Sequence, residues 1–501
     1  MSIFNKKSFY LFSFIVFIEL ISFLGYFHPE LNRIGFLFIV LAFLILTLIK
    51  FEYGVLALLI ELFISSKGYL FYYDFGGVFL SIRIAFWLIL MSVWFASEVV
   101  KLIKTKKIEI SFFKSEYFSY FVALFIFVIW GLVNGFLNHN AFNNIFFDFN
   151  GWLFWLLIFP IFSVIYKRRK IINNILQVFL VSTTWVSLKT LLLLYIFSHN
   201  ISGISSIYRW IRETGVGEIT LVMGGFYRIF FQSHIFVLIG FFIILIFLIN
   251  FSREKIKEDN KIFIFNFLLL IIFTAVNLIS FSRSNWLGMV CGLLSFFLFV
   301  IWKLGWKRFL RSVIILLISL VLSFGLIISI VKFPFPDPTG GFDASELFSK
   351  RATQIMGEAG ASSRWALLPK LWTKIKESPI LGKGFGTTVT YVTSDPRFLE
   401  TSITGEYTTY AFEWGWLDIW LKLGIFGLLS YLLLLFIILY KSIKKIDEYP
   451  NFEKLLVFGL LLGIISISVV SFFSPYMNHP LGIGYLVLAT SILSQNKKLL
   501  P

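Results

Sequence analysis

Two arginines stand at boundaries between polar segments and long apolar segments. Arg283 lies in the run SFSRSNW (residues 280–286), between two apolar runs, and Arg228 lies just before another. An arginine this close to hydrocarbon is costly unless it is paired or hydrated, so snorkelling or interfacial anchoring is one interpretation. The other is an anion clamp, because guanidinium binds phosphate oxygens in bidentate fashion. We expect both arginines at one membrane depth, with the pyrophosphate of a lipid-linked sugar as their ligand and Ser282 and Ser284 beside it.

Three further arginines add positive charge to the same region. Arg209 and Arg212 flank Trp210, and Arg364 begins the sequence RWALL in a long polar segment. The first two are either anion-binding or interfacial anchors. Arg364 is either a third anion ligand or the partner of a helix cap.

Glu413 is the candidate general base. It stands in the run FEWGWL (residues 412–417), where the long polar segment returns to an apolar one. A carboxylate here can accept the proton of an acceptor hydroxyl. Alternatively it is a negative charge favoured at a helix N-terminus by the macrodipole. Asp418 follows about one turn later and can share either role.

Several other chemistries are disfavoured. No D-x-D pair occurs among the segments assigned below to the outer face, so we expect a metal-independent enzyme without cofactors. The run GKGFG (residues 382–386) lacks the full phosphate-loop spacing and predicts a turn. The net charge of +17 is spread over many short loops, which is typical of membrane orientation and not of nucleic-acid binding.

These residues must be positioned by membrane helices, because 58% of the chain is hydrophobic, only 14% is charged, and Phe alone occurs 64 times. Apolar runs predict an all-α polytopic membrane protein with about fourteen spanning helices, the third of them short. Glu19, Glu61 and Lys189 are isolated charges within these runs, and we expect them to pair with one another. The predicted spans are 8–26, 34–49, 53–66, 80–99, 117–137, 149–166, 174–197, 232–251, 262–281, 284–302, 311–331, 416–440, 455–474 and 480–494.

The distribution of lysine and arginine predicts the orientation. With the N-terminus inside, the loops around Lys106, Arg168, Lys257 and Lys444 are basic. The short outer loops 27–33, 67–79, 138–148 and 475–479 carry only Arg33 and Lys67. Both termini are therefore predicted to be cytoplasmic.

Two outer segments are long, 198–231 and 332–415, and long segments in compact proteins are usually functional. The second contains patterns typical of short helices lying over the membrane. We predict three parts of the chain. Residues 1–223 form N-terminal helices with outer segment 198–223, residues 224–440 form a catalytic region that includes loop 332–415, and residues 441–501 form C-terminal helices.

The order of these features resembles the O-antigen ligase and polymerase superfamily over about residues 224–431. Four landmarks carry the resemblance: Arg228, the S-x-S-R-S-x-W-L run at 280–287, the S-R-W…S-P-I-L-G-K-G-F-G stretch at 363–386, and L-x₆-G-x-x-G at 417–427. One position departs from the pattern. Ligases of this family usually show His-Asn where this chain has Glu413 and Trp414, which favours a polymerase-like member with Glu413 in the role of the histidine.

The resemblance implies a helical fold of the GT-C type in the bacterial inner membrane, with an extracytoplasmic active site. It implies transfer of a glycan from an undecaprenyl-pyrophosphate donor to a glycan or lipid acceptor, with other polysaccharide-assembly proteins as partners. Polymerisation of surface-polysaccharide repeat units is the first reading, and ligation to a lipid A core is the alternative. A flippase of lipid-linked glycans is the rival from another class. It is disfavoured because the polar residues gather at one face and not at the midplane.

Overall fold

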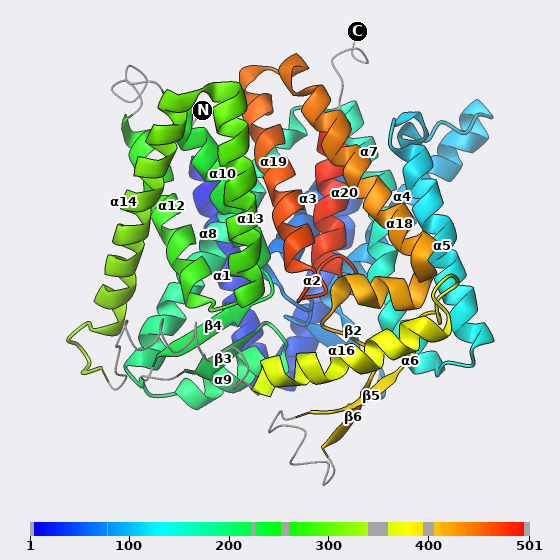
Figure 1. The fold of residues 1–501 in the computed structure, drawn as a ribbon, viewed down its shortest axis with the longest axis horizontal. Helices are drawn as coiled ribbons and strands as arrows, with labels where there is room; N and C mark the ends of the chain where they lie inside the picture. The colour runs from blue at the N-terminus through cyan, green and yellow to red at the C-terminus, as the bar shows by residue number, and fades with distance from the viewer. Residues whose placement is uncertain are drawn as a thin grey trace. The chain divides into compact units, whose positions relative to one another are not determined.

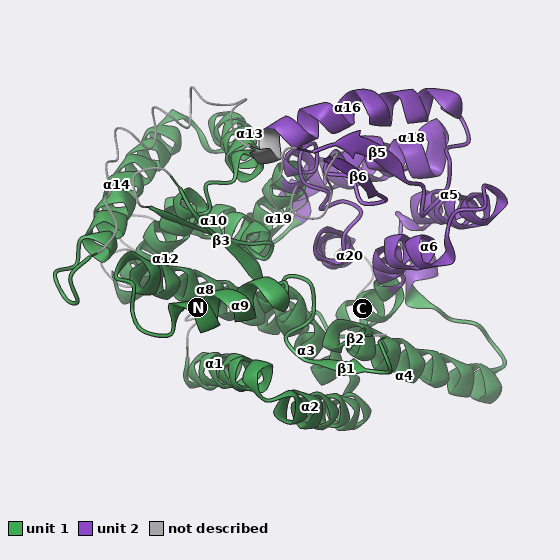
Figure 2. Cartoon of the chain, turned by 90° about the horizontal axis from the view of Figure 1, so that it is seen from below, with its two compact units in different colours: residues 1–111, 157–342, 449–466 green, residues 112–156, 343–448, 467–501 purple. Residues whose placement is uncertain are grey.

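The computed structural model describes residues 5–77, 79–222, 226–251, 260–338, 359–393 and 405–494. These residues form mostly α-helices, together with three two-stranded antiparallel sheets (Figure 1). The chain divides into two compact units, coloured separately in Figure 2. Unit 1 comprises residues 1–111, 157–342 and 449–466, and unit 2 comprises residues 112–156, 343–448 and 467–501. The helical polytopic class predicted from the sequence is confirmed.

Unit 1 is built around one fully buried helix. Every residue of α10 (His234–Ile249) is buried, and α8 and α12 pack against it. Two hairpins belong to this unit, β1 with β2 and β3 with β4. The other elements are α1 (Lys6–Phe27), α2 (Pro29–Ile49), α3 (Phe51–Ile64), β1 (Tyr72–Asp74), β2 (Phe79–Ser81), α4 (Ile82–Thr105), α7 (Ile158–Lys167), α8 (Ile171–Ser198), α9 (Ile204–Glu213), β3 (Gly217–Leu221), β4 (Tyr227–Phe231), α12 (Asn260–Ile279), α13 (Arg283–Phe299), the π-helical turn η4 (Val300–Leu304), α14 (Trp306–Val331) and most of α19 (Asn451–Val470).

Unit 2 is organised around α18 (Gly415–Lys444), which is broken at Gly424. Gly424 has φ of +74°, a left-handed conformation that only glycine adopts readily. Residues 415–423 and 425–444 are therefore two successive helices. The other elements are the 3₁₀ turns η1 (Ser111–Lys114), η2 (Asn150–Leu157) and η5 (Ile446–Glu448), with α5 (Phe118–Leu137), α6 (Phe142–Phe149), α16 (Ala359–Glu377), β5 (Val389–Val392), β6 (Glu406–Thr409) and α20 (Pro480–Leu493).

Each predicted spanning segment coincides with helical structure. Among the described residues, eleven helical segments are long and apolar enough to cross a membrane, and α10 and α20 are shorter apolar helices. The third predicted segment is α3, which has 14 residues. The sixth, predicted over 149–166, is interrupted: η2 leads into α7, where Pro160 has no N–H to continue the α-helical ladder. How many segments cross the membrane stays a prediction.

The buried charges inside unit 1 are paired, as we expected, but not all with one another. Lys189 Nζ donates to both carboxylate oxygens of Glu19 at 2.8 and 2.9 Å. Glu61 pairs instead with Arg83, whose Nε lies 3.0 Å from Oε2 and whose Nη atoms donate to backbone carbonyls. Paired and hydrogen-bonded charges of this kind are tolerated in apolar surroundings.

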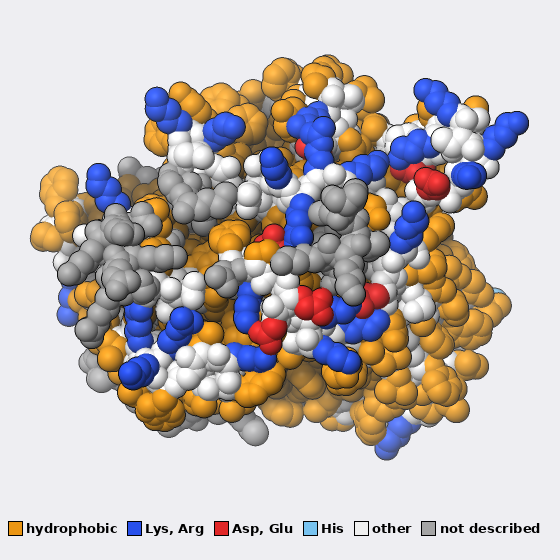
Figure 3. All heavy atoms as spheres, turned by 90° about the horizontal axis from the view of Figure 1, so that it is seen from above, with side chains coloured by type: hydrophobic (Ala, Val, Ile, Leu, Met, Phe, Trp, Pro, Cys, Tyr) orange, Lys and Arg blue, Asp and Glu red, His pale blue; other side chains and the backbone are white. Residues whose placement is uncertain are grey.

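Contacts within unit 1 follow the predicted alternation of loops. Segments predicted inside contact one another, since Arg168 pairs with Glu52 at 3.3 Å and Arg308 contacts Asn250. Segments predicted outside do the same, since His199 Nε2 lies 2.9 Å from the carbonyl oxygen of Phe333. Lysine and arginine side chains are prominent on the face drawn in Figure 3, where acidic side chains are sparse. Which face is cytoplasmic stays a prediction, and Lys257 lies outside the described residues.

Candidate functional site

The junction that carries Arg283 is a tight turn with buried polar groups. Arg283 is the first residue of α13, and Ser282 is its N-cap, whose hydroxyl accepts from the amide of Asn285. Phe281 has φ of +43° and packs against Trp286, so the chain turns sharply between α12 and α13. The predicted placement of Arg283 between two apolar helices is confirmed.

Polar side chains surround this junction although it is shielded from solvent. Ser282 and Ser284 are 7% and 5% exposed, and their hydroxyls lie 3.0 Å apart. Asn285 is 1% exposed, and neither polar atom of its side chain has a hydrogen-bond partner among the described residues. Buried polar groups nearly always have partners. The amide of Asn285 therefore offers an unused donor and acceptor close to Arg283, a role that the sequence analysis missed.

Arg228 lies on a strand that leads directly into α10 (His234–Ile249). The sequence placed it about one turn before the eighth span, but it is the second residue of β4, opposite Thr220 of β3. Tyr, Ile and Phe are residue types typical of strands, but YRIFF does not alternate and stands close to the apolar residues of α10. The Arg228 guanidinium lies 5.0 Å from the Phe230 ring centroid, and Nη1 lies 3.8 Å from Glu218.

The structure brings Arg228 to the junction of Arg283. Arg228 Nε donates to the backbone carbonyl of Ser280 at 2.9 Å, three residues before Arg283. Phe226, immediately ahead of β4, packs on Phe281 at 5.2 Å between ring centroids. Residues 52 apart in sequence are thus joined within unit 1. That the two arginines share one membrane depth stays a prediction.

Arg209 and Arg212 lie on α9, which packs beside β3 in the same unit. Trp210 between them is 6% exposed and contacts Phe23 at 5.3 Å, so it anchors the helix. Arg209 is exposed, while the Arg212 guanidinium lies 5.9 Å from the Tyr208 ring. Trp210 packs inside unit 1, and both alternatives for the arginines, interfacial anchoring and anion binding, stay predictions.

Glu413 and Arg364 form a pair of their own in unit 2. Arg364 Nε donates to Glu413 Oε2, and their side chains are 37% and 51% exposed. The neighbouring Trp414 reinforces the contact, since its indole N–H donates to the Arg364 carbonyl at 3.0 Å. Trp365 also packs edge-on against Trp414 at 5.5 Å. Arg364 is therefore the partner of the candidate base.

Glu413 does not cap the helix that follows it. The N-cap of α18 is Trp414, and no side chain caps that end by hydrogen bonding. The Glu413 carboxylate accepts a hydrogen bond from Arg364 instead, so Glu413 is not a hydrogen-bonding cap of α18. Whether Glu413 shares one membrane depth with Arg228 and Arg283 stays a prediction.

A buried ionic cluster supports the segment that carries Glu413, and the sequence did not reveal it. Lys422 Nζ lies 2.6 Å from both Asp148 Oδ1 and Asp418 Oδ1. It also donates to the carbonyl of Tyr410 at 3.1 Å, three residues before Glu413. Asp418, expected to share a role with Glu413, is 1% exposed and belongs to this cluster, where Asn478 donates to its Oδ2. Lys422 and Asn478 thus engage the Asp418 carboxylate, and a role for Asp418 beside Glu413 stays a prediction.

The glycine-rich run at 382–386 is a turn without amides to offer a phosphate. Its five backbone N–H groups all donate to protein acceptors, on Ser378, Leu421, Lys422, Gly131 and Asp148. Lys383 is engaged as well, 3.1 Å from Glu377, and hydrogen bonds from Lys374 and Lys383 hold the pKa of Glu377 below its ordinary value. The predicted turn is confirmed.

Comparison with known families supports the resemblance seen in the sequence. Residues 267–432 match the family model described as O-antigen ligase, about a third of the chain. The match includes Ser282, Arg283, Arg364 and Glu413, whereas Arg228, Arg209 and Arg212 precede it. No curated protein matches the chain.

Proposed function

Because residues 267–432 carry a domain of the O-antigen ligase and polymerase superfamily, we propose that this membrane protein is a metal-independent glycosyltransferase. It moves a glycan from an undecaprenyl-pyrophosphate donor to an acceptor glycan on the outer face of the bacterial cytoplasmic membrane. The reaction polymerises surface-polysaccharide repeat units. No ATP is available on that side of the membrane, so the energy of the new bond comes from the donor.

The contact between Arg228 and the Arg283 junction carries the proposal. The hydrogen bond from Arg228 Nε to the Ser280 carbonyl joins β4 to the turn that precedes Arg283 in unit 1. Two guanidinium groups suit the two phosphates of the donor, because each can bind oxygens in bidentate fashion. Ser282, Ser284 and the buried amide of Asn285 supply further polar contacts.

The two arginines act most strongly in the transition state. As the acceptor oxygen bonds to the anomeric carbon, the bond to the pyrophosphate oxygen breaks and negative charge grows on the leaving group. Preorganised cations aimed at that charge stabilise the transition state more than the ground state. Arg209 and Arg212 on neighbouring α9 add to the positive field that attracts the donor.

Glu413 takes the proton of the acceptor hydroxyl. Its carboxylate is half exposed, and its partner Arg364 orients it through Oε2. The buried cluster around Lys422 holds the preceding segment at Tyr410, so the base is carried on a supported part of the chain. The acceptor oxygen forms its bond to the anomeric carbon as the hydroxyl proton is transferred to the Glu413 carboxylate.

Ligation is the second candidate, because the matching family model is described as O-antigen ligase. The two functions share a donor site and differ in acceptor. Purified protein mixed with a lipid-pyrophosphate-linked oligosaccharide distinguishes them. Longer products on the lipid indicate polymerisation, and transfer to a lipid A core indicates ligation.

The test of the division of labour uses donor binding beside transfer. Arg228→Lys and Arg283→Lys keep the charge but lose the planar fork, so donor binding and transfer should both fall, transfer on the order of 10² per lost contact. Glu413→Gln keeps its size but cannot accept a proton, so transfer should fall while donor binding persists. Arg308→Lys is the matched control, because Arg308 lies in the first turn of α14 and contacts Asn250, at the end of α10 that is far from β4.

Two outcomes would refute these assignments. Normal transfer by the Glu413→Gln variant means that Glu413 is not the base. If the Arg228→Lys and Arg283→Lys variants both bind donor and transfer glycan as well as the Arg308→Lys control, the pyrophosphate binds elsewhere.

A further inference from the structure

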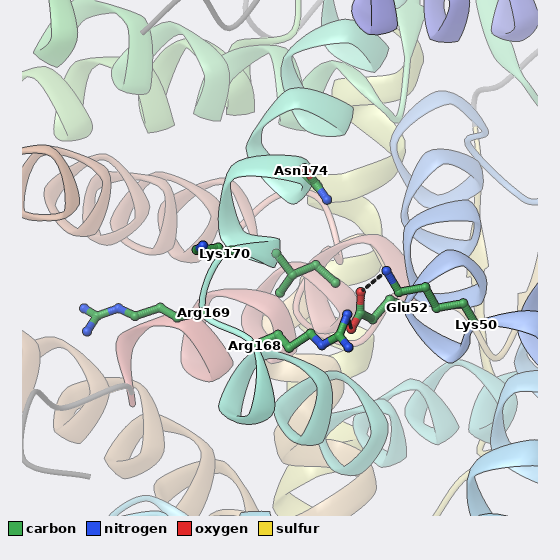
Figure 4. Close-up of a pocket in the computed structure, with 7 residues that line it drawn as sticks. Lys50, Glu52, Arg168, Arg169, Lys170 and Asn174 are labelled. Atoms are coloured by element: carbon green, nitrogen blue, oxygen red, sulfur yellow. Dashed lines mark ion pairs between the residues drawn. The ribbon is translucent and has the colours of Figure 1, made fainter. Parts of the chain in front are cut away.

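A basic pocket of about 520 Å³ lies in unit 1, away from the residues assigned to the donor. It is formed by two short loops, one that connects α2 to α3 and one that connects α7 to α8 (Figure 4). Both junctions belong to the side that the sequence predicts to face the cytoplasm. The residues that line the basic pocket are Lys50, Glu52, Arg168, Arg169, Lys170, Ile171 and Asn174.

The charges within the basic pocket do not cancel. Glu52 contacts two cations, Lys50 Nζ at 3.1 Å and Arg168 Nη1 at 3.3 Å. Arg169 points away from them in Figure 4 and pairs with Glu453. The lining therefore holds three cations, Lys50, Arg168 and Lys170, against the one carboxylate of Glu52, a formal charge of +2.

Helix ends hold these cations in place. Lys50 is both the C-cap of α2 and the N-cap of α3, and Lys170 is the N-cap of α8. The amide of Lys50 donates to the Leu46 carbonyl at 3.0 Å, while its own carbonyl accepts from Tyr53 at 2.8 Å. Since α3 and α8 pack along each other, the two junctions are fixed relative to one another.

Membrane orientation alone requires positive charge but no concave arrangement of it. Here three cations line a cavity at the predicted membrane boundary, and the side chain of Asn174 adds an amide. Basic pockets between membrane helices bind anionic headgroups, and guanidinium matches the geometry of phosphate. We propose that the basic pocket binds a phosphate group, of the kind carried by an anionic phospholipid headgroup or by a soluble phosphate.

The experiment compares two double variants with equal loss of charge. Arg168→Gln/Lys170→Gln removes two cations from the basic pocket and leaves the pair of Lys50 with Glu52. Lys104→Gln/Lys107→Gln removes two exposed cations near the end of α4 and is the matched control. Full-length protein is reconstituted in phosphatidylcholine nanodiscs with a minor fraction of phosphatidylglycerol, and retained phosphatidylglycerol is measured by native mass spectrometry. A second arm titrates inorganic phosphate into the detergent-solubilised protein.

The wild type and the α4 control should retain phosphatidylglycerol, and the pocket variant should lose affinity on the order of tenfold. Selective loss of lipid retention identifies a lipid headgroup as the source of the phosphate. If the wild type does not retain phosphatidylglycerol but binds inorganic phosphate, and only the pocket variant loses that binding, the ligand is a soluble phosphate. Equal behaviour of the two double variants in both arms overturns the proposal. The readout is binding, so it is independent of the proposed glycan transfer.

Discussion

Replacing Lys422 should destabilise unit 2 far more than replacing Lys445, the paired lysine that caps the end of α18. The side chain of Lys422 is 1% exposed, and the side chains of Asp148 and Asp418 are 8% and 2% exposed. Lys422→Met leaves both carboxylates buried without their cation, and breaking a buried ion pair costs roughly 3–5 kcal/mol. That is a large part of a typical folding free energy of about 5–15 kcal/mol.

Lys445→Met is the matched control. Lys445 also lies beside α18 and pairs with Glu116 at 2.7 Å, but both side chains are about a quarter exposed, 24% and 25%. A pair with this much solvent contributes about 1 kcal/mol or less. Asp418→Asn should cost less than Lys422→Met, because one lysine then faces one carboxylate, Asp148.

The assay is thermal unfolding of the detergent-solubilised full-length protein. We expect the apparent Tm to fall in the order Lys445→Met, Asp418→Asn, Lys422→Met, with the last lowest. If Lys422→Met and Lys445→Met unfold at the same temperature, the buried cluster does not stabilise unit 2 as argued.

Three further outcomes are expected. In a Cys291→Ser background, a membrane-impermeant thiol reagent applied outside the cell should label Thr388→Cys but not Lys106→Cys; labelling of the latter contradicts the orientation. Transfer should survive EDTA, and activity lost on chelation and restored by Mg²⁺ or Mn²⁺ would show that a metal takes part. Gly384→Ala should lower the free energy of unfolding by about 3 kcal/mol or more, and so lower the Tm strongly, because φ is +80° and the new Cβ would lie 2.0 Å from the amide of Gly135. Gly76→Ala, with φ of +70° and nothing within 4 Å, carries only the strain of about 1 kcal/mol and should unfold close to the wild type.

The sequence predicts the helices well because lipid demands them. A chain in hydrocarbon must satisfy its backbone hydrogen bonds internally, so long apolar runs become helices. The interruption ahead of α7 was missed, since its apolar residues continue without a break and only Pro160 marks the point. The strand that carries Arg228 was also missed, because the apolar residues of YRIFF merge with the helix that follows.

The partners of the site residues were the least predictable part. Arg364 and Glu413 were both identified as candidates, but their pairing joins positions 49 residues apart. Lys422 and Asp148 are 274 residues apart, and each alone looks like an ordinary interfacial charge. Such pairs depend on how helices pack, which the spacing of residues along one chain does not record. The family match extends over the Arg283 junction and Glu413 but begins after Arg228.

The break in α18 has a consequence for how the outer segment can move. At Gly424 the hydrogen bonds within the helix are interrupted, and residues 378–386 provide partners for its backbone groups. The amide of Lys383 donates to the Leu421 carbonyl at 2.7 Å, and the amide of Ile425 donates to the Pro379 carbonyl at 3.0 Å. A hinge within this turn would break these hydrogen bonds, and each buried backbone group left unsatisfied costs about 1–3 kcal/mol. Residues 378–386 therefore form one rigid element with the broken helix α18. Any movement of the segment that precedes α18 must therefore pivot elsewhere, with residues 378–386 staying bound to the broken helix.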